Sequence, residues 1–261
     1  MISRDEALSA LGADYVRAGI VWAFESACEQ ALEDFARGTG YKAPSAGLGR
    51  YELIADRLDR VFSCGDFEVP AGLESVGLDV LYEGLSEASI ASMPTVKAGL
   101  VVRNNLNGSN GWSLAGFRFI THSFTLGELT GIDWTSTRKT LQAVSRQAQA
   151  TDSPDLNLLD SLLSPQQRSD LAAQDSLPAV HIPTLVLAHA LDRNTSEREL
   201  AIGQSRYNDD EGHPWHWQEP LLGGPAPERG PRAIPENPTG PISEPDAPVR
   251  LRPAASAEVA L

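Results

Sequence analysis

The hydrophobic pattern of this chain begins with a helical period. In residues 3 to 38, apolar side chains recur every three or four positions, which predicts an amphipathic helix that begins with Ser3 as its N-cap. Residues 50 to 62 repeat this spacing and predict a second helix. Residues 78 to 85 fit either a strand or a short helix, because their apolar positions satisfy both periods. The first third of the chain is therefore predicted to be mainly helical.

An alternating pattern replaces the helical one further along the chain. Residues 96 to 103 alternate between the two faces of a predicted strand. Residues 104 to 111 are dense in Asn and Gly, which tolerate a positive φ, so they predict a turn that leads into a partner strand at 112 to 120. Three more strands are predicted near the end of the folded part, at residues 184–190, 200–207 and 213–218.

Together these patterns predict an α+β protein, in which a helical N-terminal half packs on a small antiparallel sheet and a C-terminal β-meander completes the fold. Residues 1–218 are expected to form a single folded domain. Ten of the 18 prolines lie between Pro220 and Pro253. Such a segment buries too little apolar surface to offset its chain entropy, so residues 219–261 are predicted to be a disordered Pro-rich tail.

Charge limits which partners this chain can bind. The formal net charge is −14 and the sequence pI is about 4.7, so a uniform surface would repel nucleic acid and anionic membranes. Contact with DNA would need a local basic patch. No apolar run reaches the length of a membrane span, the first residues are acidic rather than signal-like, and Cys28 and Cys64 do not form a disulfide framework. A cytoplasmic protein without membrane contact is expected.

The segment 123–144 resembles a helix-turn-helix, in which a second helix reads the DNA major groove. Residues 124–130 would form the first helix, residues 131–134 the turn, and residues 135–144 the second helix. Arg138 and Lys139 lie in the first turns of that second helix and would contact phosphates or base edges. Arg103 and Arg118, on the neighbouring hairpin, are candidate phosphate clamps. The leading hypothesis is a protein that binds duplex DNA.

An alternative hypothesis is a Mg²⁺-dependent nuclease. Asp79 followed by Thr95-Val96-Lys97 resembles the core of PD-(D/E)xK restriction-type nucleases, where two acids hold Mg²⁺ and a lysine stabilises the attacking hydroxide or the phosphate. Thr95 occupies the position of the second acid, which Glu83 or Glu87 could supply instead. The resemblance implies catalytic roles for Asp79 and Lys97 and metal binding by Asp79 and Glu83.

A third hypothesis is an acidic protein-interaction protein without catalysis, which would bind a protein partner through the Pro-rich tail. The chain has no GxSxG elbow, P-loop, GxGxxG fingerprint or CxxC pair. Hydrolases, NTPases, dehydrogenases and zinc ribbons that depend on those motifs are therefore disfavoured. Carboxylates and histidines also gather at residues 209–216, but the two histidines are three positions apart on a predicted strand and would point to opposite faces.

Overall fold

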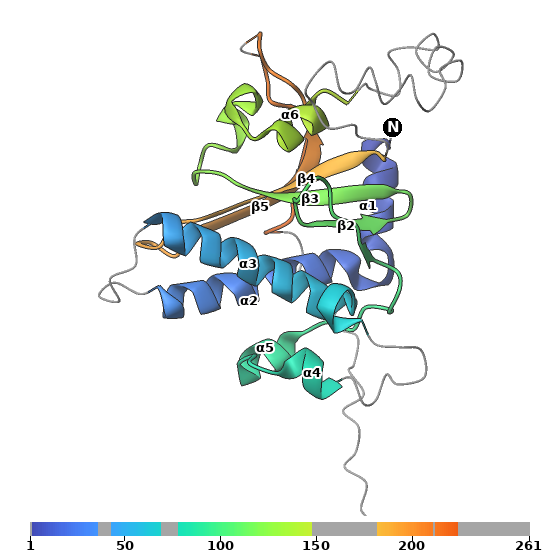
Figure 1. Cartoon of the computed structure of the whole chain (residues 1–261), viewed down its shortest axis with the longest axis vertical. Helices are drawn as coiled ribbons and strands as arrows, with labels where there is room; N and C mark the ends of the chain where they lie inside the picture. The colour runs from blue at the N-terminus through green and yellow to red at the C-terminus, as the bar shows by residue number, and fades with distance from the viewer. Residues whose placement is uncertain (1, 36–42, 69–77, 148–181, 211, 224–261) are drawn as a thin grey trace, which may run out of the picture. The chain divides into compact units, whose positions relative to one another are not determined.

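The computed structural model describes residues 2–35, 43–68, 78–147, 182–210 and 212–223. It has helices in the N-terminal half and a mixed sheet in the C-terminal half, which confirms the predicted α+β class (Figure 1). The helices are α1 (Arg4–Gly12), α2 (Val16–Asp34), α3 (Ala43–Phe62), α4 (Leu78–Tyr82), α5 (Glu87–Ser92) and α6 (Lys139–Ser145). The strands are β1 (Val102–Arg103), β2 (Gly111–Leu114), β3 (Phe117–Ser123), β4 (Thr184–Leu191), β5 (Arg198–Ser205) and β6 (Trp215–Pro220). The described ranges also contain the 3₁₀ turns η1 (Ala13–Tyr15), η2 (Gly65–Phe67), η3 (Leu129–Gly131) and η4 (Trp134–Ser136).

The first predicted helix is correct in type but is not continuous. Ser3 and Glu6 form the predicted capping box at its start, with Ser3 N donating to Glu6 Oε2 at 2.8 Å. Asp14 and Tyr15 then adopt left-handed backbone angles, with φ of 46° and 63°, and separate α1 from α2. Left-handed residues cannot continue a right-handed helix, so the apolar period resumes in a new direction at Val16.

In the described part of the chain, six strands form one sheet with the order β1-β2-β3-β4-β5-β6. Neighbouring strands are antiparallel except for β3 and β4, which run parallel with Thr121 opposite Leu187. The predicted small sheet and the predicted C-terminal meander are therefore two halves of one sheet, joined by this parallel pair. A parallel pair needs a long crossover connection, which here contains η3, η4 and α6.

The sheet lies between two helical layers (Figure 1). Helices α2 and α3 cover one face, where Phe119, Leu187 and Ile202 belong to the larger hydrophobic core. Helix α6 covers the opposite face, where Leu141 packs in a second core with Val186. Along each of the strands β3 and β4, successive residues thus belong to different cores, because successive side chains point to opposite faces of the sheet. This explains why the apolar pattern of β4 is continuous rather than alternating.

Two strand predictions near the centre needed correction, and one segment that fitted either period is resolved. The strand predicted at 96–103 is reduced to β1, and the ambiguous segment at 78–85 forms helix α4 rather than a strand. The strand predicted at 112–120 is split by a tight turn at Ala115 and Gly116, with φ of 48° and 85°. The predicted hairpin itself is confirmed, since β1 pairs with β2 across the Asn-rich loop. The three later strands appear as β4, β5 and β6.

No helix within the described ranges is both long and apolar enough to cross a membrane. The tail predicted at 219–261 begins too early, because residues 219 and 220 belong to β6 and Leu221 is buried in the larger core. From residue 224 onward, the predicted tail lies outside the residues that the structure describes.

Candidate functional site

The segment that resembled a helix-turn-helix has a different structure. Strand β3 runs to Ser123, residues 124–128 form no helix, and η3 covers only the end of the predicted first helix. The 3₁₀ turn η4 lies where the predicted turn meets the second helix. Gly127 has a φ of +83°, which breaks a helix at its centre. Trp134 is fully buried, and its Nε1 donates to the Pro214 carbonyl at 2.6 Å, which ties this connection to the loop before β6. Contacts with distant residues, rather than local helix propensity, therefore determine the structure of this segment. The helix-turn-helix prediction is wrong.

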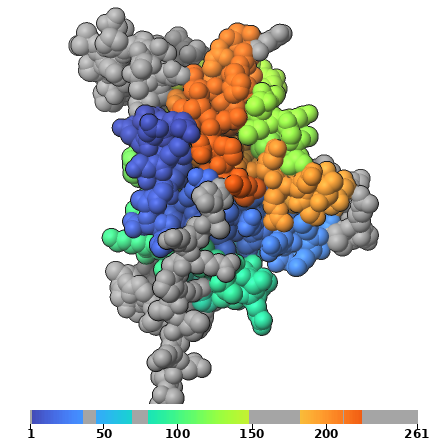
Figure 2. Space-filling model, turned by 180° about the vertical axis from the view of Figure 1, so that it is seen from behind, coloured from blue at the N-terminus to red at the C-terminus, as the bar shows by residue number. Residues whose placement is uncertain are grey.

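Helix α6 is the part of that prediction that forms. Its inward face is apolar, with Leu141 and Val144 buried against the sheet. Arg138 is the N-cap residue and Lys139 the first helical residue, and both are exposed, as is Arg146 at the other end. We call these three cations the α6 surface. In the view of Figure 2, residues around α6 (yellow-green) lie at the surface of the molecule beside the C-terminal strand (orange).

The α6 surface is positively charged without nearby acids in the sequence. No Asp or Glu occurs between Asp133 and Asp152. Within the described residues, no ion pair links Arg138, Lys139 or Arg146 to a carboxylate. Arg138 Nη2 donates to the Thr121 carbonyl at 3.2 Å, and the Arg146 guanidinium lies 3.5 Å from the centre of the Tyr207 ring. These contacts orient two of the cations, and neither contact supplies a negative charge.

Arg103, a predicted phosphate clamp, is committed to an internal ion pair instead. Its Nη1 donates to Asp59 Oδ2 at 2.6 Å, and its guanidinium lies 4.6 Å over the Trp112 ring. Nε donates to Asn105 Oδ1 at 2.8 Å and Nη2 to Asn110 Oδ1 at 2.5 Å. Arg103 therefore holds the Asn-rich loop in place. Its charge is already neutralised by the Asp59 carboxylate, so it is a poor candidate for a phosphate contact.

Arg118, the second predicted clamp, is also built into the fold. It is buried in β3, and its Nη1 contacts Asn104 Oδ1 at 3.4 Å and the Asn105 carbonyl at 3.3 Å. Burial lowers the pKa of this guanidinium. Its polar contacts are with the loop at residues 104–110, which indicates a structural role. The buried guanidinium is therefore not placed to contact a phosphate. The sequence did not reveal this, since burial of an arginine depends on strand pairing.

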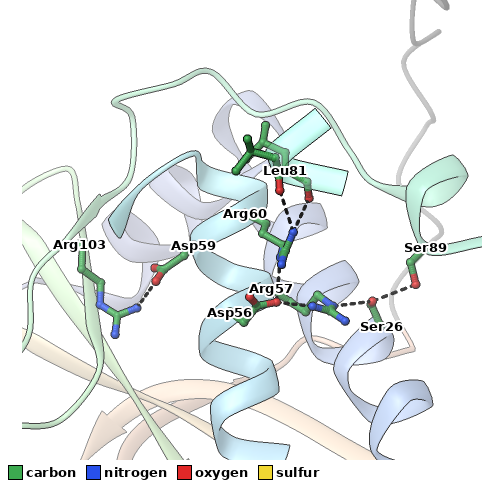
Figure 3. A network of polar contacts seen from close by, with 9 residues as sticks. Ser26, Asp56, Arg57, Asp59, Arg60, Leu81, Ser89 and Arg103 are labelled. Atoms are coloured by element: carbon green, nitrogen blue, oxygen red, sulfur yellow. Dashed lines mark hydrogen bonds and ion pairs between the residues drawn. The ribbon is translucent and has the colours of Figure 1, made fainter. Parts of the chain in front are cut away.

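The polar network around Asp59 was missed at the sequence level. Asp59 lies in α3, and its Oδ1 accepts from Trp112 Nε1 at 2.8 Å while Oδ2 binds Arg103. Figure 3 shows this pair beside a second group on the same helix, in which Arg57 contacts Asp56 and donates to Ser26 Oγ at 3.2 Å. Asp59 is buried, and its partners Arg103 and Trp112 lie more than 40 residues away in the sequence, so only the fold reveals this network.

Nor does the structure provide the strand framework of a PD-(D/E)xK nuclease. That chemistry needs its acids and lysine on neighbouring strands, yet the Asp79 backbone belongs to helix α4 and Glu83 follows that helix. Lys97 lies exposed in the loop before β1. Within the described ranges, no group of three or more His, Cys, Asp or Glu residues is placed to hold a metal ion. The predicted Mg²⁺ site of Asp79, Glu83 and Lys97 assumed that these residues lie on neighbouring strands, and they do not.

One histidine beside the α6 surface has a strongly altered acidity. Burial lowers the pKa of His122 to about 4, with a further contribution from the Arg138 charge. Its ring packs 5.3 Å from the Trp134 ring. The folded state therefore keeps this imidazole neutral at pH values where the unfolded chain, with a pKa of about 6.5, is protonated.

This difference predicts acid sensitivity. Between about pH 6.5 and pH 4 the unfolded state binds more protons, so the free energy of unfolding falls as the pH falls, by at most about 1.4 kcal/mol per pH unit from His122. His122→Gln should make this dependence shallower. Urea unfolding of both proteins at several pH values measures it, and equal slopes would contradict the assignment.

A comparison of the chain with known protein families, with characterised proteins and with solved structures yields no match in any of the three.

Proposed function

We propose that this protein binds duplex DNA through the α6 surface. The supporting observation is the set of three exposed cations, Arg138, Lys139 and Arg146, on a short stretch without acids in a chain of net charge −14. DNA carries a dense array of phosphates, and cations that neutralise them supply most non-specific affinity. An acidic protein can bind DNA only where such a patch faces the duplex.

The proposed contact differs from helix-turn-helix docking. Helix α6 has only seven residues and packs its buried face on the sheet, so the cations at its two ends would contact backbone phosphates. Phosphate contacts position a protein on DNA but carry little sequence information. Binding is therefore expected to be strongly salt-dependent and weakly selective for sequence.

A binding titration on mixed-sequence duplex DNA at several salt concentrations tests the proposal. The wild-type protein should bind, and log K should fall with log salt. The double variant Arg138→Ala/Lys139→Ala should bind more weakly, and its salt slope should be smaller by about 2 because each lost phosphate contact removes about 1. Thermal stability should change little, because neither side chain belongs to the buried cores.

Lys97→Ala is the matched control, since it removes an exposed lysine outside the α6 surface. It should retain wild-type affinity and salt slope. Equal binding by the double variant and the wild type, or no binding by the wild type at low salt, would overturn the proposal. Adding Mg²⁺ and examining the DNA on a gel extends the experiment to cleavage, for which Asp79→Ala is the relevant variant.

A further inference from the structure

A buried arginine, for which the described residues supply no carboxylate partner, lies at the carboxyl ends of β3 and β4. Arg50, in α3, is only 8% exposed. Its Nη2 donates to Ser123 Oγ at 2.8 Å and its Nη1 to the Leu191 carbonyl at 3.2 Å, while Nε has no hydrogen-bond partner. No ion pair within the described ranges neutralises this guanidinium. A buried charge without a counter-charge is unfavourable, so its missing partner calls for an explanation.

A buried histidine with unused nitrogens accompanies it. His189, in β4, is fully buried, and neither Nδ1 nor Nε2 has a hydrogen-bond partner. It lies opposite Ser123 in the parallel register of β3 and β4, and its ring centre is 6.2 Å from that of Phe24 on α2. Burial lowers the pKa of His189, and the nearby Arg50 charge lowers it further. The imidazole thus faces the same helical layer that carries Arg50.

The chemistry of these atoms favours an oxygen-bearing anion. A guanidinium presents a planar fork of donors that matches a carboxylate or a phosphate, and the buried Nε of Arg50 has no hydrogen-bond partner among the described residues. An imidazole N–H and the Ser123 hydroxyl are further donors. In sheets with parallel strands, ligands commonly bind beyond the carboxyl ends of those strands, which is where Ser123 and Leu191 end β3 and β4.

We propose that Arg50, His189 and Ser123 form a binding site for a small oxyanion, a carboxylate or phosphate group that supplies the missing counter-charge. The site shares no residue with the α6 surface and is independent of DNA binding. An oxyanion would accept from Arg50 Nε and from one His189 ring nitrogen, which accounts for donors that are otherwise buried without partners.

Thermal unfolding with sodium phosphate, sodium acetate or sodium chloride at matched ionic strength tests this site. Phosphate, acetate or both should raise Tm in a saturable way beyond the effect of chloride, because a ligand that binds only the folded state stabilises it. A response to phosphate alone identifies a phosphate-type ligand, and a response to acetate alone identifies a carboxylate. Equal effects of all three salts would overturn the proposal.

Arg50→Met removes the charge while keeping an unbranched apolar side chain. It should abolish the anion response, and its Tm without the anion should not fall below that of the wild type, since it removes an uncompensated buried charge. Arg17→Met is the matched control, because Arg17 lies outside the proposed site and donates to the backbone carbonyls of residues 220 and 221. An unchanged anion response in Arg50→Met would overturn the assignment.

A measurement on the wild-type protein makes the test independent of how the variants fold. The ¹⁵N resonances of the His189 ring should shift on addition of the stabilising anion, with assignment from a His189→Gln spectrum. No shift at saturating anion would contradict the site. The variant Arg138→Ala/Lys139→Ala should keep the full anion response, so failure of the DNA proposal would not affect this one.

Discussion

Replacing Asp59 by Ala should lower the free energy of unfolding by about 3–5 kcal/mol. The carboxylate is 11% exposed and balances the Arg103 charge at 2.6 Å while it accepts from Trp112 Nε1. Its removal leaves a partly buried guanidinium without a counter-charge and a buried indole N–H without an acceptor, and both are costly. Urea denaturation of wild-type and variant proteins measures the loss.

Two comparison variants separate charge from packing. Asp59→Asn keeps an oxygen that can accept from Trp112 but loses the charge, so its loss should be smaller than that of Asp59→Ala. Glu52→Ala removes an exposed acid of the same helix, and the effect should be smaller again. A loss below about 1 kcal/mol for Asp59→Ala would show that the ion pair does not hold the Asn-rich loop in place.

Replacing Trp134 by Ala is expected to cost about 3–5 kcal/mol, because it empties a large, fully buried site. The Trp134 ring makes an edge-on contact with Trp215, with 5.1 Å between ring centres, and its Nε1 holds the Pro214 carbonyl. Loss of the Trp134 side chain should also weaken the packing of the β3–β4 connection, which contains α6, against the sheet. Denaturation curves measure the cost, and near-ultraviolet circular dichroism reports on the loss of the tryptophan pair.

Trp134→Phe is the comparison variant, since it keeps a six-membered aromatic ring but removes the Nε1 donor together with the smaller ring of the indole. It should retain most of the stability, with a loss of about 1–3 kcal/mol. Comparable losses in the two variants would mean that the hydrogen bond to Pro214, rather than ring packing, anchors this connection.

The sequence was a good guide where a local pattern decides the structure. The apolar run at β4 and the stripe of α3 predicted their elements because burial on one or both faces is encoded in consecutive residues. The sequence was a poor guide where distant contacts decide. Segment 124–130 had the composition of a helix, but the hydrogen bonds of Trp134 and the left-handed Gly127 gave it another shape.

The candidate sites show the same division. Arg138 and Lys139 could be identified from the sequence, because exposed cations near a helix start need no tertiary information. Arg103 and Arg118 are cations of the same kind as Arg138. Their partners Asp59 and Asn104 lie elsewhere in the sequence, and only the fold shows that these residues are in contact. Arg50 and His189 were not singled out at all, since their missing partners are visible only when burial is known.

The parallel pairing of β3 with β4 also has a kinetic consequence. Strands β1 to β3 and strands β4 to β6 each pair with their neighbours in sequence, so each half can form through short-range encounters. Joining the halves requires the chain from residue 124 to residue 183 to close as a loop, and the entropy of that closure must be overcome before β3–β4 contacts stabilise it. The docking of the two halves is thus the step that should limit the folding rate, and the edge of β4 that pairs with β3 stays unpaired until it occurs.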